Sequence, residues 1–326
     1  MTKLILGTYT KALSKGIYTI DLDEKAGKLG EVTLLLEECG STWVDFSSDG
    51  SKVVTTTNGG VALHDIATGE RTSVVVDGPA PCYVALDEER GLVYSANYHD
   101  GNIKIHTVSP FELKQTIQYV GHSVHANQDQ ARAHFVAPTP DGRLITCDLG
   151  SDQVHLYDLD EDNVATEIEV LNTLPGCGPR QITFAPDGSK FYLLGELDAT
   201  VSVVSYPEMR ILSVTPTLPA DFDILKNSGA AIKVSDDGRF VYVTNRGHDS
   251  LATLKVEENN LELLGHVSVE GEHPRDFNII SDKFIVVANL FTNNLTLFAR
   301  DKKTGAVKLL QKDVFAPECV CVKEFI

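Results

Sequence analysis

The chain has 326 residues, 42% of them hydrophobic and 23% charged, with no biased tract long enough to indicate a disordered tail. Its 28 lysines and arginines against 46 aspartates and glutamates give a net charge of -18, which argues against nucleic-acid and anionic-membrane partners. No apolar run reaches the ~18 residues that span a bilayer, and the N-terminus MTKLILGTYT turns polar too early for a secretory signal. We therefore expect a cytoplasmic protein. The sequence does not predict its oligomeric state.

A repeat runs through the chain. Six copies of the order strand, tight turn, strand, polar turn, strand begin near residues 41, 81, 132, 178, 228 and 273, and the segments 178–206 and 228–256 align without a gap. A seventh copy is split, because its first strand begins near residue 317 and the remainder lies at residues 3–22. These starting points are 40 to 51 residues apart, which is room for four short strands in each repeat.

Seven such repeats predict an all-β fold: a seven-bladed β-propeller with four-stranded blades, closed by the N- and C-terminal strands in one blade. Closure leaves only short, protected edges, so we expect residues 1–326 to form a single domain. Long 3.6-residue periodicities are hard to find, so helices should be few.

We interpret two sets of residues as structural rather than functional. Asp-Gly pairs begin at Asp49, Asp141, Asp187 and Asp237, in phase with the repeat, and predict turns between strands rather than calcium loops. The six cysteines are spread along the chain without zinc-site spacing and predict reduced, mostly buried thiols. We expect neither a metal nor a cofactor.

Equivalent positions of a propeller repeat lie around one mouth of the central channel. Aligning the repeats therefore predicts which residues are neighbours in space. The third residues of the seven repeats are Trp43, Tyr83, His134, Arg180, Ala230, Arg275 and Cys319. Structural repetition alone would favour one residue type there. Two arginines, a histidine and two aromatic residues instead predict a cradle for a polar, anionic small molecule.

Two later positions add to this pattern. The end of the next strand reads Asn97, Asp148, Gly195, Asn245 and Asn289, and short polar side chains of this kind predict turn residues that bond nearby backbone. The following position holds Glu196 and Arg246, where other repeats have apolar or aromatic residues. Sequence alone leaves open whether these two form a structural ion pair or a layer of a site.

The same residues carry a resemblance over nearly the whole chain. The segments GTYT with GIYTIDL, AHFVAPTPDGR with DLGSDQV, GCGPRQITFAPDG with GEL, DGRFVYVTNRG, and HPRDFN with NLFTNNLTLF resemble the lactonase family of seven-bladed propellers. That family includes bacterial 6-phosphogluconolactonases and fungal carboxymuconate cyclases. In place of two histidines common in the family, this chain has Arg132 and Gln181.

The resemblance implies a carboxylic ester hydrolase that acts on a small anionic sugar lactone, 6-phospho-D-glucono-1,5-lactone of the pentose phosphate pathway. It implies catalytic roles for His134, Arg180, Glu196 and Arg246 and a further cation at Arg275. From the repeat positions themselves we expect Tyr83 and Trp43, with the neighbouring Arg132, to bind the substrate together with Arg275.

An arginine, Arg180 or Arg246, would polarise the carbonyl. His134 or Glu196 would deprotonate water, and we favour His134 because an imidazole titrates near ~6.5. A carboxymuconate-type cyclase and a non-enzymatic binding scaffold remain as alternatives.

Overall fold

The computed structural model describes residues 1–76 and 78–325. Over these residues the chain forms seven antiparallel sheets and one short 3₁₀ helix, η1 (Ile224–Lys226). The expectation of seven repeats with few helices is confirmed. No helix among the described residues is long and apolar enough to cross a membrane.

The chain divides into two compact units. Unit 1 comprises Met1–Glu37 with Gln181–Phe325, and unit 2 comprises Glu38–Arg180. Each unit has its own sheets and its own core, and the boundary at Arg180 falls inside strand β17. One domain over residues 1–326 stays a prediction.

Unit 2 contains three four-stranded sheets in which sequence neighbours pair. The strands are, sheet by sheet, β5 (Val44–Phe46), β6 (Lys52–Thr57), β7 (Gly60–Asp65) and β8 (Arg71–Val75); β9 (Tyr83–Asp87), β10 (Leu92–Asn97), β11 (Asn102–Val108) and β12 (Phe111–Gln118); β13 (Ala133–Pro138), β14 (Leu144–Asp148), β15 (Gln153–Leu159) and β16 (Ala165–Asn172).

Unit 1 contains four sheets. Three are β17 (Pro179–Phe184), β18 (Lys190–Gly195), β19 (Thr200–Ser205) and β20 (Arg210–Pro216); β21 (Ser228–Val234), β22 (Phe240–Arg246), β23 (Ser250–Glu257) and β24 (Asn260–Ser268); β25 (Pro274–Ile280), β26 (Phe284–Asn289), β27 (Asn294–Arg300) and β28 (Val307–Phe315). The fourth is β29 (Cys319–Phe325), β1 (Thr2–Thr8), β2 (Gly16–Asp23) and β3 (Lys28–Leu29), with β4 (Thr33–Glu37) also paired to β2.

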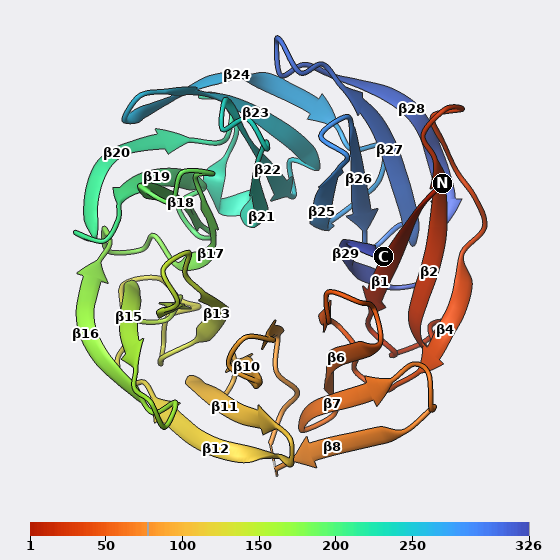
Figure 1. The fold of residues 1–326 in the computed structure, drawn as a ribbon. Coiled ribbons are helices and arrows are strands. Elements are labelled where there is room, and N and C mark those ends of the chain that lie inside the picture. The colour runs from red at the N-terminus through yellow and green to blue at the C-terminus, as the bar shows by residue number, and fades with distance from the viewer. Residues whose placement is uncertain (77, 326) are drawn as a thin grey trace. The chain divides into compact units, whose positions relative to one another are not determined.

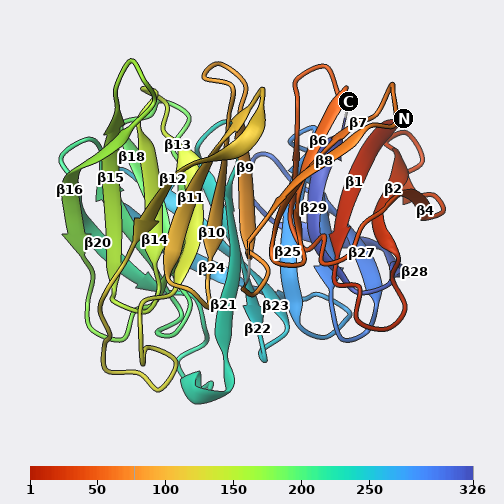
Figure 2. The same ribbon diagram turned by 90° about the horizontal axis from the view of Figure 1, so that it is seen from below.

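The two chain ends meet in that fourth sheet, as the sequence predicted. β1 pairs antiparallel with β29, from Lys3 opposite Phe325 to Thr8 opposite Cys319. Figure 1 shows β29 and β1 side by side, and Figure 2 shows the teal β20–β21 connection, which carries η1, extending past the ends of β21 and β22.

The Asp-Gly turns behave as predicted. Between β17 and β18, the Gly188 N–H donates to the carbonyl of Ala185 at 2.9 Å, and the Asp187 carboxylate accepts the backbone N–H of Ser189 at 3.0 Å. Gly188 has φ +69°, a left-handed conformation that glycine adopts without a steric penalty. A similar turn recurs at Gly238, which has φ +70°.

Burial differs between the strands of a sheet. The second strands β10, β22 and β26 are buried at every position, whereas the outer strand β20 alternates between exposed and half-buried residues. The third strands β11 and β15 are mostly buried as well. His106 and His155 are buried there, and His155 stacks on Tyr119 with ring centroids 4.4 Å apart.

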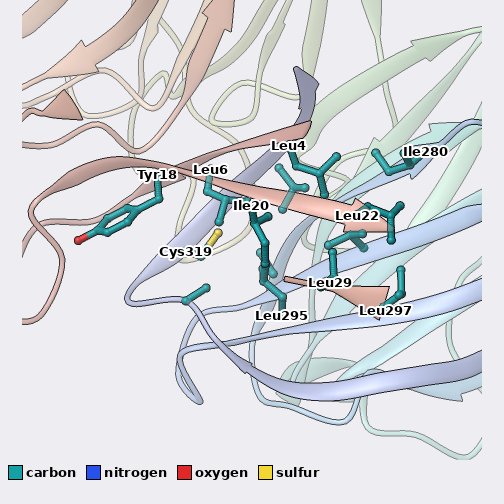
Figure 3. Close-up of a cluster of buried hydrophobic side chains, with 14 of the residues drawn as sticks. Leu4, Leu6, Tyr18, Ile20, Leu22, Leu29, Ile280, Leu295, Leu297 and Cys319 are labelled. Atoms are coloured by element: carbon teal, nitrogen blue, oxygen red, sulfur yellow. The ribbon is translucent and has the colours of Figure 1, made fainter. Parts of the chain in front are cut away.

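A hydrophobic cluster joins the sheet of the chain ends to the neighbouring sheet of unit 1. Leu4 and Leu6 of β1 pack with Leu295 and Leu297 of β27, and all four side chains are 0% exposed. Figure 3 shows these side chains together with Cys319 of β29. Burial of this apolar surface holds the N-terminal strands against residues almost 300 positions away in sequence.

Leu6→Ala should lower the free energy of unfolding by about 2–5 kcal/mol, because it removes buried methyl groups and leaves a cavity. Urea unfolding followed by intrinsic fluorescence measures the change. Leu13→Ala is the matched control, since Leu13 is 59% exposed and should cost little. Equal effects of the two substitutions would contradict this account of the cluster.

Candidate active site

His134 and Arg275 share an unusual position in their sheets. The pairing register of β13 with β14 shifts between Ala133 and Phe135, and the register of β25 with β26 shifts in the same way around Arg275. His134 and Arg275 are therefore the extra residues of β-bulges. A bulge leaves its extra residue out of the ladder and re-aims the side chain, and bulges are frequent beside active sites. The predicted equivalence of these two residues is confirmed.

Trp43 and Tyr83 stand one position further along, which differs from the sequence alignment. Tyr83 pairs with the penultimate residue of β10, as Phe135 pairs with the penultimate residue of β14. The rings of Trp43 and Tyr83 stack at 4.4 Å, and those of Tyr83 and Phe135 lie 4.8 Å apart. Tyr83 therefore corresponds to Phe135, and Cys82 rather than Tyr83 takes the position of His134.

His134 lies in a polar and aromatic setting within unit 2. Its side chain is 7% exposed, and its ring meets the ring of Tyr98 edge-on at 5.8 Å. The Cys82 thiol donates to the carbonyl of His134 at 3.5 Å and so contacts the bulge from the adjacent sheet. These contacts hold the backbone of the bulge and set the imidazole against Tyr98.

Arg132 is held by its own contacts in unit 2. Its guanidinium lies over the Tyr98 ring at 5.0 Å and pairs with Asp129, with 2.7 Å between nitrogen and oxygen. Because Asp129 balances its charge, Arg132 adds less positive charge to the surroundings than the sequence suggested. Arg180, at the start of β17, is buried at 4% exposure.

The clearest charged cluster lies in unit 1. The Arg246 guanidinium and the Glu196 carboxylate form an ion pair at 3.1 Å, with side chains 8% and 13% exposed. Arg246 also donates to the carbonyl oxygens of Gly229 at 2.6 Å and Ser228 at 3.3 Å. The ion pair that the sequence left open is therefore formed.

Burial lowers the pKa of Arg246, the Glu196 carboxylate opposes that effect, and the positive charge of Arg275 adds to it. Arg275 is thus close enough for its charge to act on Arg246. The predicted site residues of unit 1 are brought together: Glu196, Arg246 and Arg275.

The sequence analysis missed Tyr9. In the sheet of the chain ends, the register shift leaves Val320 out of the ladder, so Val320 rather than Cys319 corresponds to Arg275. Tyr9, which follows β1, then corresponds to Glu196 and Arg246. Its ring lies beneath the guanidinium of Arg275, with 5.6 Å between the guanidinium carbon and the ring centroid. The GTYT motif, which contains Tyr9, could have pointed to this residue. The register of β1 with β29 could not be predicted, because this repeat is split between the two chain ends.

The Asn and Asp set at the strand ends is structural, as predicted. The Asp148 carboxylate accepts the backbone N–H of Arg132 at 2.5 Å, and the Asn245 amide donates to the carbonyl of Thr217 at 3.0 Å. The side chains of Asp148 and Asn245 thus form hydrogen bonds with the backbone of nearby segments.

Gln181 also has a structural contact. Its carbonyl oxygen accepts the backbone N–H of Ile232 in the next sheet at 3.1 Å, as the Asp276 carboxylate accepts that of Val322 at 2.9 Å. These bonds tie neighbouring first strands together in unit 1. The departure from the family pattern at Gln181 therefore places a hydrogen-bond acceptor between two sheets.

No group of three or more His, Cys, Asp or Glu side chains arranged to hold a metal ion occurs within residues 1–76 and 78–325. Four of the six cysteines are buried, as expected: Cys147, Cys177, Cys319 and Cys321.

The chain belongs to the family described as lactonase, 7-bladed beta-propeller, whose model matches residues 3–324. The predicted fold class and the family resemblance are thereby confirmed.

Among its relatives is the 6-phosphogluconolactonase of Bacillus subtilis, 37% identical over 99% of both chains. The chain is also similar to a solved protein of Lactobacillus plantarum, with a TM-score of 0.95 and 38% identity over 100% of this chain and 99% of that one. A periplasmic gluconolactonase of Pseudomonas aeruginosa gives a TM-score of 0.90 and 26% identity over the same shares.

Glu196→Gln should lower the free energy of unfolding by about 3 kcal/mol, because it leaves the buried Arg246 charge without its carboxylate. Chemical unfolding at neutral pH measures the loss. Lys312→Gln is the control: it removes an exposed pair with Glu270 and should cost at most about 1 kcal/mol. A double variant with Arg246→Met should lose less than the sum of its single variants. A Glu196→Gln loss no larger than the control would refute the structural role of the pair.

Proposed function

We propose that this protein hydrolyses a sugar δ-lactone and that its substrate is 6-phospho-D-glucono-1,5-lactone, a compound of the pentose phosphate pathway. The observation that carries the proposal is the Glu196–Arg246 pair beside Arg275 in unit 1. Two arginines against one carboxylate leave a net positive charge where an anionic substrate would need it. Family membership and the names of the Bacillus subtilis and Pseudomonas aeruginosa relatives support a lactone as the class of substrate.

The reaction adds water across one ester bond. Water attacks the carbonyl carbon, the carbonyl oxygen gains negative charge, and the bond from that carbon to the ring oxygen breaks as the ring oxygen takes a proton. The uncatalysed reaction is already easy, so oriented groups and fixed charges are sufficient.

The side chains divide these tasks in our proposal. Arg180 or Arg246 polarises the carbonyl and stabilises the developing oxyanion, and Arg275 binds the phosphate. His134 accepts the proton of the attacking water, because Glu196 is already engaged with Arg246 and is the weaker base. Tyr83 and Trp43 offer aromatic faces to the sugar, while Arg132, paired with Asp129, has the smaller part.

Purified protein treated with a chelator should accelerate hydrolysis of freshly generated 6-phosphoglucono-δ-lactone above the spontaneous rate. Arg180→Ala should reduce kcat by about 10²-fold, the usual effect of removing one oxyanion donor. Arg210→Ala is the matched control, since Arg210 is an exposed residue at the start of β20. A wild-type rate equal to the spontaneous rate would refute the proposal and turn attention to a cyclase reaction or a binding role.

His134→Gln should lower kcat by about 10²-fold or more and remove the acid limb of the pH–rate profile, because a protonated imidazole cannot accept a proton from water. The measurement is kcat between pH 5 and 8. Near-wild-type turnover across that range would show that His134 is not the base, and Glu196→Gln would then be the variant to assay.

A further inference from the structure

The loop that follows β1 brings a second cation to Tyr9. The ammonium nitrogen of Lys11 lies 4.7 Å from the centroid of the Tyr9 ring, and the guanidinium carbon of Arg275 lies 5.6 Å from it. Both groups are within the ~6 Å over which an aromatic face attracts a cation. One ring in unit 1 therefore holds two cations from segments more than 260 residues apart in the sequence.

These two cations have no carboxylate partner. Over residues 1–76 and 78–325, neither Lys11 nor Arg275 forms an ion pair. The third cation in the cluster, Arg246, is balanced by Glu196. Two positive charges at Tyr9 are thus left without counter-charge in a chain whose net charge is -18.

The side chains at Tyr9 are accessible. Lys11 is exposed, and Tyr9 and Arg275 are half-buried. An anion from solvent can therefore reach the two cationic groups, whereas the Arg246 side chain is buried. Partial burial strengthens charge-assisted hydrogen bonds relative to those at a fully exposed surface.

The loop itself is fixed in place. The Glu318 carboxylate accepts the backbone N–H groups of four successive residues, Lys11, Ala12, Leu13 and Ser14, at 2.9–3.1 Å. The N–H of Tyr9 donates to the carbonyl of Glu318 at 3.0 Å. These bonds order the backbone that carries Tyr9 and Lys11 before any ligand arrives, which reduces the entropy cost of binding. The charge of Glu318 is directed at the backbone rather than at Lys11.

We propose that Lys11, Tyr9 and Arg275 form a subsite for the dianionic phosphate of a phosphate monoester. Lys11 supplies a mobile point charge, Arg275 a planar fork that matches two phosphate oxygens, and the Tyr9 ring contacts both cations. The subsite makes Lys11 a determinant of selectivity for phosphorylated over unphosphorylated lactones. That last step rests on the proposed function.

The test compares kcat/KM for 6-phosphoglucono-δ-lactone with kcat/KM for glucono-δ-lactone. Lys11→Gln should lower the ratio of the two about tenfold, mainly through a higher KM for the phosphorylated lactone, because one charged hydrogen bond to phosphate is lost. Lys15→Gln is the matched control: it makes the same charge change four residues along the same loop and should leave the ratio unchanged. Tyr9→Phe should keep the ratio, because the ring remains, and Tyr9→Leu should lower it.

A binding measurement separates this inference from the proposed function. Calorimetric titration with 6-phosphogluconate and with gluconate needs no turnover, and wild type should bind the phosphorylated acid more tightly, with the preference reduced in Lys11→Gln. If wild type hydrolyses no lactone but shows this pattern, the subsite stands and the proposed reaction fails. Equal ratios and equal affinities in Lys11→Gln and wild type would overturn the subsite while leaving lactone hydrolysis intact.

Discussion

The pairing of β1 with β29 is the constraint on which unit 1 depends. It joins the first strand of the chain to the last, and the cluster of Leu4 and Leu6 with β27 holds that sheet against its neighbour. Without it, the sheet that β1, β2, β3 and β4 form would lack the strand β29. The same pairing sets Tyr9 beside Glu318 and brings the backbone of Lys11 within 3.1 Å of a carboxylate 307 residues away. The position of Tyr9 and Lys11 beside Arg275 is thus a consequence of how the chain ends are joined.

Charge is distributed unevenly in this protein. Its surplus of carboxylates favours solubility, and at physiological salt the field of distant charges is screened within about 8 Å. Local groups therefore decide what binds. Arg246 is buried and balanced by Glu196, so it contributes orientation more than net charge. Arg275 and Lys11 keep their charges uncompensated at the half-buried ring of Tyr9. Of these three cations, Arg275 and Lys11 are the ones that solvent reaches.

Repeat alignment predicted part of the candidate site because equivalent strands carry equivalent irregularities. His134 and Arg275 were correctly assigned to the same repeat position, and the structure supplies the reason, a bulge at the same point of β13 and β25. Trp43 and Tyr83 were aligned with them one position off, since counting residues cannot show which residue of a first strand lies opposite the penultimate residue of the next strand. Tyr9 was missed because its repeat is split between the chain ends. In that repeat the register shift leaves Val320 out of the ladder, so Val320 rather than Cys319 is the counterpart of Arg275.

The amino-acid order alone predicts the number of repeats, the strands, the turns and the joining of the chain ends in one sheet, because those follow from local patterns that recur seven times. It also determined which residue types break the pattern. Only the tertiary structure decided which of them meet: that Glu196 pairs with Arg246, that Asp129 neutralises Arg132, and that Lys11 and Arg275 share one aromatic ring. Such contacts depend on register shifts and on side-chain directions between sheets, which distance along the chain does not encode.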